Sequence, residues 1–493
     1  MTFRRFASLL ILSFSMAFMA SADVKPHHAT RKGVAKLPVT TGSRQARTHF
    51  EKAMENLEAV RLNDMVAELR LAIKADPKFA QAWILLSHFS RDPQEQQAAR
   101  KHAKLCAGRS TKGEQLLVHW MASAEEDNYL PAIAAMNDLL AMYPKDAQLA
   151  LLAGGWLSIQ GRYEEAIPVL QRAVNLKPDY PAALNELAYA YAFTGEFTKP
   201  LSLMQQYVAL QPDEPNPHDS FGEILRMAGK FDEALEQYRM SVKIDPMFGS
   251  ELGVADTYAL MGKEQEAREE YARAITFSPN QSDKIDFELK SAVTWIREDN
   301  RRQAEHSLRA VAKAAHAAGL GKTEAEAHRV LAMYEPDYKA AMKQLDAAQA
   351  ALDEPHQLPK VDRDEEHARI LQIRAMRSAE ANAVNTAQEA EQQLNTMAQS
   401  SRSQVIQLAW NAAKGSVLVG QSKYAEAVDY LQEDASDPLS LRLLWQAYRN
   451  MGRSAQATEV ASKLAATNVP TAEQAIVVPL FRASLASQVR PTQ

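Results

Sequence analysis

The residue types that carry out catalysis or bind metals are scattered along this 493-residue chain, without a metal-binding or catalytic spacing. His306, His316 and His328 recur at intervals of ten and twelve residues, which do not place imidazoles together on one face of a helix. Cys106 is the single cysteine, so neither an internal disulfide nor a cysteine-based metal site can form. We therefore predict that the protein binds no metal and no cofactor.

The motifs of common enzyme classes are also missing. The sequence has no phosphate-binding loop, no H-E-x-x-H zinc helix and no G-x-S-x-G nucleophile turn. The acidic run Asp362 to Glu366 has the chemistry of a cation or acid–base site. It follows a proline-containing loop, however, and suits the start of a helix, where acidic residues stabilise the dipole. We predict no enzymatic activity; an enzyme with its site in residues 284–400 stays an alternative.

The first 22 residues have the features of a bacterial export signal. Arg4 and Arg5 precede the apolar run Phe6 to Ala20, and Ala20-Ser21-Ala22 predicts cleavage after Ala22. We expect a periplasmic or extracellular protein, with an uncleaved membrane anchor as the alternative. No later stretch has 18 consecutive apolar residues, so we expect no membrane span after cleavage. The net charge of −5 also argues against nucleic acid as a partner, because such proteins carry a basic face.

Two columns of residues recur with a period of about 34 and indicate repeated helix pairs. The proline column is spaced 34, 34, 34 and 33 residues and consists of Pro144, Pro178, Pro212, Pro246 and Pro279. The glycine column lies 17 residues before the last four prolines and consists of Gly161, Gly195, Gly229 and Gly262. Glycine permits the sharp turn between two helices, and proline ends the second helix of each pair. Since one helix pair cannot bury its apolar face alone, the pairs must stack into a solenoid.

These columns resemble the tetratricopeptide repeat. In the unit 215–248 the motif positions hold His218, Phe221, Gly222, Leu225, Ala234, Tyr238 and Pro246. The resemblance implies an all-α, right-handed superhelical solenoid of antiparallel helix pairs, with longer irregular pairs in the C-terminal half. The predicted organisation is a signal peptide (1–22), a flexible basic arm (23–42), divergent repeats (43–112), a regular array (113–281), longer irregular pairs (282–402), closing repeats (403–470) and a C-terminal cap or tail (471–493).

In this family the first helix of each pair lines a concave groove that binds peptides or partner helices. Carried over position by position, the resemblance implies a groove that contains Asn185, Tyr189, Phe193, Asp219, Glu223, Arg226 and Asp256. The Asn185 amide can pair with an extended backbone, and the two aromatic side chains can stack on a partner. The carboxylates would favour a basic partner segment. The alternative is that these residues are only solvated and the contact surface lies elsewhere.

We conclude from the sequence that the chain is an exported, non-enzymatic scaffold that binds a partner protein or peptide. Self-assembly into a homo-oligomer stays open as a further alternative. It is suggested by the apolar run Val477 to Phe481, which either packs back as a cap or forms a contact with another molecule.

Overall fold

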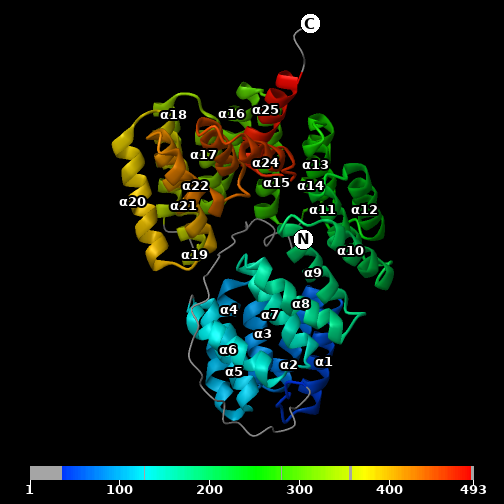
Figure 1. Cartoon of the computed structure of the whole chain (residues 1–493). Coiled ribbons are helices and arrows are strands. Elements are labelled where there is room, and N and C mark those ends of the chain that lie inside the picture. The colour runs from blue at the N-terminus through cyan, green and yellow to red at the C-terminus, as the bar shows by residue number, and fades with distance from the viewer. Residues whose placement is uncertain (1–35, 127, 279, 355–357, 490–493) are drawn as a thin grey trace. The chain divides into compact units, whose positions relative to one another are not determined.

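The computed structural model describes residues 36–489 apart from 127, 279 and 355–357. The predicted export signal with its cleavage site lies outside the described residues, as do positions 23–35 of the predicted arm. The part that the structure describes is built from α-helices without a β-strand, and consecutive helices form antiparallel pairs (Figure 1). This confirms the predicted all-α class and the stack of helix pairs. None of the described helices is long and apolar enough to cross a membrane.

The described residues divide into two compact units, an N-terminal unit that ends at Gln211 and a C-terminal unit that begins at Pro212. The division falls within the segment 113–281, which the period predicts as one array. The helices of the N-terminal unit are α1 Arg44–Glu58, α2 Leu62–Ala75, α3 Ala80–Phe89, α4 Pro93–Cys106, α5 Lys112–Glu125, α6 Tyr129–Met142, α7 Ala147–Ile159, α8 Tyr163–Leu176, α9 Pro181–Phe193 and α10 Thr198–Leu210.

The C-terminal unit has longer helices in its middle part, where α19 reaches 21 residues. Its helices are α11 Pro215–Met227, α12 Phe231–Ile244, α13 Glu251–Leu260, α14 Glu264–Phe277, α15 Gln281–Arg297, α16 Arg301–Ala317, α17 Gly321–Tyr334, α18 Tyr338–Asp353, α19 Lys360–Glu380, α20 Val384–Ser400, α21 Gln404–Gly420, α22 Tyr424–Glu433, α23 Pro438–Asn450, α24 Ser454–Ala465 and α25 Ala472–Val489.

The turns within the pairs explain the glycine column. Gly161, Gly195, Gly229 and Gly262 have φ angles between +70° and +82°, in the left-handed region that glycine enters without a steric cost. After Gly161, the Arg162 N–H donates to the Leu157 carbonyl at 2.9 Å, which closes the end of α7. Outside the glycine column, Gly452 adopts the same conformation after α23, and the non-glycine residues that adopt it are Val60, Asp299, Asn382 and Ser422.

A second glycine position lets the two helices of a pair approach closely. A Cβ atom at Gly154 would lie 2.4 Å from Leu170 Cγ, and a Cβ at Gly415 would lie 2.5 Å from Leu431 Cγ. Both contacts join residues 16 positions apart, one on each helix of a pair. The same register in α7–α8 and α21–α22 shows that the closing pairs pack as the regular ones do.

The C-terminal helix α25 folds back onto its own unit. It contacts α15, α17, α23 and α24, and Val477, Val478 and Phe481 are buried there. The Phe481 ring packs edge-on against Trp445 at a centroid distance of 5.1 Å. The apolar run therefore acts as a cap within the chain, the first of the two roles that its sequence suggests.

The described end of the predicted flexible arm is not free. Residues 37–41 have no regular secondary structure and are hydrogen-bonded to the N-terminal unit, with the Leu37 N–H donating to Asp146 and the Thr40 N–H to Glu114. For these residues the prediction of a flexible arm is corrected, because side chains of the helix ends hold the backbone in place.

Candidate functional site

The first helices of the pairs form a row along one side of each unit. Contacts join α3 to α5 and α7 to α9 in the N-terminal unit, and join consecutive first helices from α11 to α23 in the C-terminal unit. In a curved stack of helix pairs, the row whose helices touch one another lies on the inside of the curve. We call this side the first-helix row; all seven predicted site residues lie on its helices.

Three predicted site residues, Asn185, Tyr189 and Phe193, share one face of α9 because they are spaced four residues apart. Phe193 is half-buried and stacks on Tyr163 at a centroid distance of 4.8 Å and on Tyr189 at 6.2 Å. Asn185 is 0% exposed, and among the described residues neither its amide nitrogen nor its amide oxygen has a hydrogen-bond partner. This face therefore combines an aromatic stack with an unsatisfied donor and acceptor.

Two polar side chains accompany this face. The Glu186 carboxyl follows Asn185 in α9, and burial raises its pKa to about 7. The buried Ser158 hydroxyl on α7 has no hydrogen-bond partner in the described part of the chain. Sequence reasoning missed Glu186, although it is the only charged residue between Pro181 and Phe193.

The first helix of the N-terminal unit, α1, also contacts α9 near the end of the same unit. Lys177, in the loop before α9, pairs with Glu58 at the end of α1 at 2.6 Å. Both side chains of this ion pair are about one-third exposed. Helix α1, the first helix of the unit, is therefore held against α9, the helix that carries Asn185.

In the C-terminal unit, the charged site residues pair with one another. Arg226 is 3% exposed and lies 2.8 Å from a Glu223 oxygen and 3.3 Å from an Asp256 oxygen. Asp256 also accepts hydrogen bonds from the Tyr271 hydroxyl at 2.6 Å and from Lys290 at 3.2 Å. This differs from the expected row of free acidic groups, because the charge of Asp256 is neutralised inside the unit.

The remaining predicted residue, Asp219, has a partner at the start of α13. It is half-buried and accepts a hydrogen bond from the Ser250 hydroxyl at 2.6 Å. The structure thus brings Glu223, Arg226 and Asp256 together but gives Asp219 a different partner.

The acidic run at the start of α19 is likewise paired. Glu366 is 0% exposed and accepts from Arg329 at 2.7 Å, and Asp362 pairs with Lys322. Arg329 also contacts Glu473 of α25 at 3.0 Å, which ties the C-terminal helix to α17. Among the described residues, no group of three His, Cys, Asp or Glu side chains is arranged to hold a metal ion.

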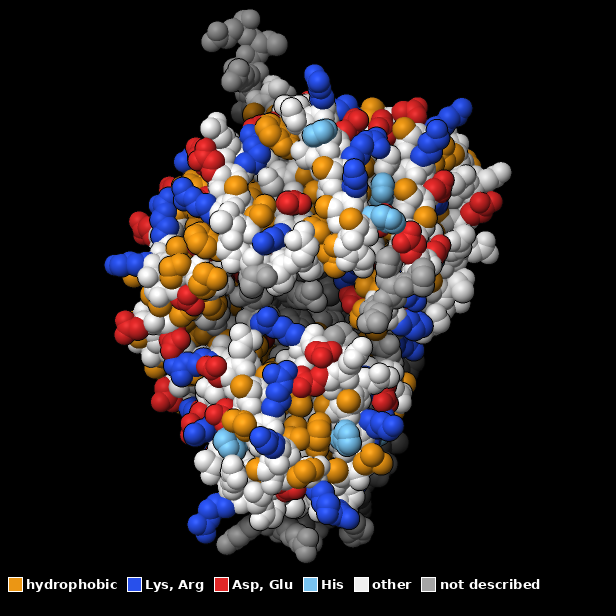
Figure 2. Space-filling view, turned by 180° about the vertical axis from the view of Figure 1, so that it is seen from behind, with side chains coloured by type: hydrophobic (Ala, Val, Ile, Leu, Met, Phe, Trp, Pro, Cys, Tyr) orange, Lys and Arg blue, Asp and Glu red, His pale blue; other side chains and the backbone are white. Residues whose placement is uncertain are grey.

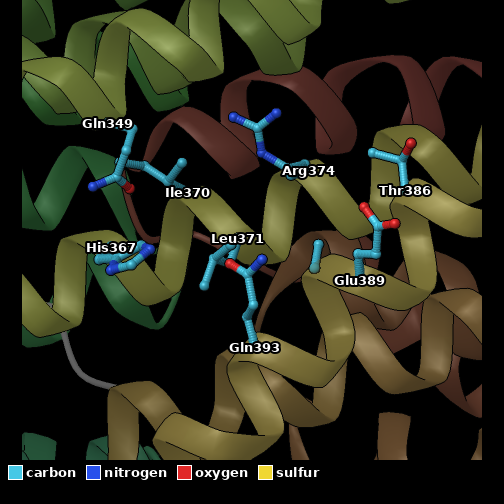
Figure 3. A pocket seen from close by; sticks show the side chains of 9 residues that line it. Gln349, His367, Ile370, Leu371, Arg374, Thr386, Glu389 and Gln393 are labelled. Carbon is cyan, nitrogen blue, oxygen red and sulfur yellow. The ribbon is translucent and has the colours of Figure 1, made fainter.

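A hollow of about 450 Å³ lies between α18, α19 and α20, in the segment where an enzyme site was the alternative (Figure 3). Burial lowers the pKa of His367, which lies at the opposite end of the hollow from Glu389 in Figure 3. Arg374 is already paired with Asp346 at 2.8 Å.

The surface charges are mixed in sign. Figure 2 shows basic and acidic side chains interspersed over the visible face of each unit. This distribution matches the small net charge and provides no continuous basic surface on that face.

Comparison with known proteins returns helical repeat proteins. A family model described as the TPR repeat matches residues 158–195, from the end of α7 through α9. A search of curated protein sequences found no match. The solved structures that resemble the chain include MamA, with 20% identity, a TM-score of 0.30 and coverage of 35% of this chain and 94% of that one.

Two further structures are similar. PilW, a type IV pilus biogenesis factor, has 17% identity and a TM-score of 0.30 over 47% of this chain and 93% of that one. A tetratricopeptide repeat protein from Parabacteroides merdae has 14% identity and a TM-score of 0.34 over 54% and 92%. The family-model match lies within the stack of glycine-turned helix pairs, and the residues that it matches are a tetratricopeptide repeat.

Proposed function

We propose that this protein is a non-enzymatic scaffold that binds an extended segment of a partner protein on the first-helix row, at the face of α9. The observation that carries the proposal is the Asn185 amide, which is buried and whose donor and acceptor both lack a partner among the described residues. Leaving such a group unpaired costs about 1–3 kcal/mol, which a peptide backbone would offset by supplying one N–H and one carbonyl.

The neighbouring side chains suggest the chemistry of the partner segment. The stack of Tyr163, Phe193 and Tyr189 offers aromatic surface for an apolar side chain. Glu186 would ionise fully if a lysine or arginine were placed beside it, because an opposite charge lowers the pKa that burial has raised. We therefore retain a basic partner segment, with Glu186 rather than Asp256 as the residue that attracts it.

The proposal places this scaffold in the cell envelope, with the export signal removed after Ala22. Mass measurement of the chain purified from a periplasmic fraction tests this. We expect an N-terminus at Asp23; an intact chain in the membrane fraction would instead support the anchor.

The test of binding uses photo-crosslinking in the full-length chain expressed in its host. A benzophenone amino acid replaces Phe193, and a matched control places it at the exposed Glu164 on the second helix α8. We expect a defined adduct from position 193 and none from position 164, with the partner identified by mass spectrometry. Equal labelling at both positions, or no adduct at either, would contradict binding at α9.

A second variant separates binding from folding. Asn185→Leu keeps a similar shape and loses no hydrogen bond among the described residues, so the free chain should be no less stable. Crosslinking at position 193 should nevertheless fall, because the partner backbone loses its amide contact. Unchanged crosslinking in this variant would remove Asn185 from the site.

A further inference from the structure

A row of polar side chains at the N-terminal ends of the first helices holds residues 37–41 as an extended strap. The Leu37 N–H donates to Asp146 at the start of α7 at 2.8 Å. The Thr40 N–H and hydroxyl donate to the two Glu114 oxygens at the start of α5, at 2.7 and 2.6 Å. The Thr41 hydroxyl donates to Asp76, in the loop before α3. The strap thus crosses three successive helix ends in order.

The strap is held mainly through its backbone. Besides the N–H groups of Leu37 and Thr40, the Pro38 carbonyl accepts from the Gln81 side chain at 3.1 Å, and the Val39 carbonyl accepts from Arg47 at 2.9 Å. Contacts to main-chain groups recognise an extended conformation rather than one particular sequence. The threonine hydroxyls add the side-chain selectivity.

The receiving side chains are buried, and each also accepts hydrogen bonds from the start of its own helix. Asp146 is 5% exposed, and its other oxygen accepts from the N–H groups of Gln148 and Leu149, which caps α7. Glu114 is 1% exposed and accepts from the N–H and hydroxyl of Thr111 in a capping box. Each carboxylate is therefore fixed by its own helix end, and would keep its position if the strap left.

The contacts of residues 37–41 define what the helix ends select. Leu37 and Thr40, which reach α7 and α5, are three residues apart, and Thr41, which reaches the loop before α3, follows directly. The site therefore selects a free N–H at one position and, three residues later, an N–H with a hydroxyl side chain, followed by a second hydroxyl side chain.

We propose that the N-terminal ends of α3, α5 and α7 form a binding site for extended polypeptide, separate from the face of α9. Residues 37–41 are its resident occupant, and the same segment supplied by another molecule exchanges with them. The intramolecular copy is joined to α1 through Gly42 and Ser43. Such a short tether produces an effective concentration on the order of millimolar, so the parent chain resists free peptide at micromolar concentration.

The test uses the full chain with the strap weakened in place by Thr40→Val and Thr41→Val. These changes keep the β-branched shape and remove the hydroxyls that reach Glu114 and Asp76. The matched control is Thr48→Val, which removes an exposed hydroxyl that bonds to the Arg44 carbonyl of its own helix. The probe is a fluorescent peptide with the sequence of residues 36–43, followed by fluorescence anisotropy.

We expect the strap variant to bind the peptide at least about tenfold more tightly than the parent or control chain. A peptide with both threonines changed to valine, or with an N-methyl group at the Leu37 position, should bind at least about tenfold more weakly than the unmodified peptide. Hydrogen exchange on the unlabelled chains should show faster exchange of the Leu37 and Thr40 amides in the strap variant. Failure of the peptide to bind any chain, or equal binding of the modified peptides, would overturn the proposal.

Discussion

Gly154 and Gly155 are neighbours in α7 with different surroundings, so the same substitution should affect them in opposite directions. A Cβ atom at Gly154 would lie 2.4 Å from Leu170 Cγ and 2.5 Å from its Cδ2, closer than carbon atoms can approach. A Cβ at Gly155 would meet only a Glu186 oxygen, at 3.9 Å. We therefore compare Gly154→Ala with Gly155→Ala.

The magnitudes follow from two terms. Replacing glycine by alanine inside a helix stabilises it by roughly 0.5–1 kcal/mol, and this gain is the same for both variants. Leu170 is 0% exposed, so it must repack inside the core to admit the methyl group at Gly154, at a cost of about 1–3 kcal/mol. We expect Gly155→Ala to raise the free energy of unfolding and Gly154→Ala to lower it. The difference between the variants is about 1–3 kcal/mol, because the propensity gain cancels.

Urea unfolding of the full chain, followed by tryptophan fluorescence and circular dichroism, measures these changes. Trp120 and Trp156 pack edge-on within the N-terminal unit, with ring centroids 6.1 Å apart, and report on its unfolding. Gly415→Ala is the control for the other unit, since its Cβ would meet Leu431 at 2.5 Å, and it should destabilise the C-terminal unit instead. Equal stabilisation by both α7 variants would refute the close packing between α7 and α8.

Three further predictions concern buried ionisable groups. Glu186 has a folded-state pKa of about 7, above its ordinary 4.5, so it binds its proton more tightly in the folded state. Stability of the N-terminal unit should therefore fall as the pH rises from 4.5 to about 7, by up to about 3 kcal/mol, and Glu186→Gln should remove this dependence in pH-dependent urea titrations. Arg329→Met leaves Glu366 without its main counter-ion and should destabilise the C-terminal unit by about 3–5 kcal/mol in the same assay. Glu473→Gln should instead mainly speed amide exchange in α25, and unchanged exchange there would contradict its attachment through Arg329.

The repeat period allowed the helix pairs to be predicted from sequence because each column has a local cause. Glycine at Gly161 and its equivalents is required by a left-handed turn, and this turn depends on residues within one helix pair. The register between the helices of a pair is also local, since Gly154 and Leu170 are 16 residues apart. Where these columns are missing, as in α15–α20, the sequence still indicated helices but not how they pack.

The partners of the site residues were harder to predict. The resemblance implies Asn185, Tyr189 and Phe193 as groove residues, and their spacing of four residues places them on one face of α9. Asp256, in contrast, receives Tyr271 from α14 and Lys290 from α15. Lys290 lies one period of 34 residues after Asp256, so the sequence places the two residues at equivalent positions of neighbouring helix pairs. Whether their side chains meet depends on the distance between the stacked pairs, which the sequence does not give.

The strap shows the limit of local sequence patterns. Residues 37–41 contain a proline and two threonines without apolar periodicity, which is the pattern of a flexible segment. The groups that order them lie far along the chain: Glu114 is 74 residues from Thr40, and Asp146 is 109 residues from Leu37. Only the folded stack brings these carboxylates into a line.

The two units differ in how firmly their first-helix rows are covered by the chain itself. In the C-terminal unit, α25 covers α15, α17 and α23 and is held by the buried Arg329 and by Val478 and Phe481, at 0% and 6% exposure. In the N-terminal unit, the charged link between α1 and the α9 region is the partly exposed pair of Lys177 and Glu58, and such pairs contribute at most about 1 kcal/mol.

A partner that enters a first-helix row must separate one of these contacts. Breaking the exposed pair costs less than removing buried apolar and charged groups together, so under the proposed function we expect a partner to gain access to the N-terminal unit first. Because the strap leads directly into α1, its release would loosen that same closure, which connects the helix-end site to the face of α9.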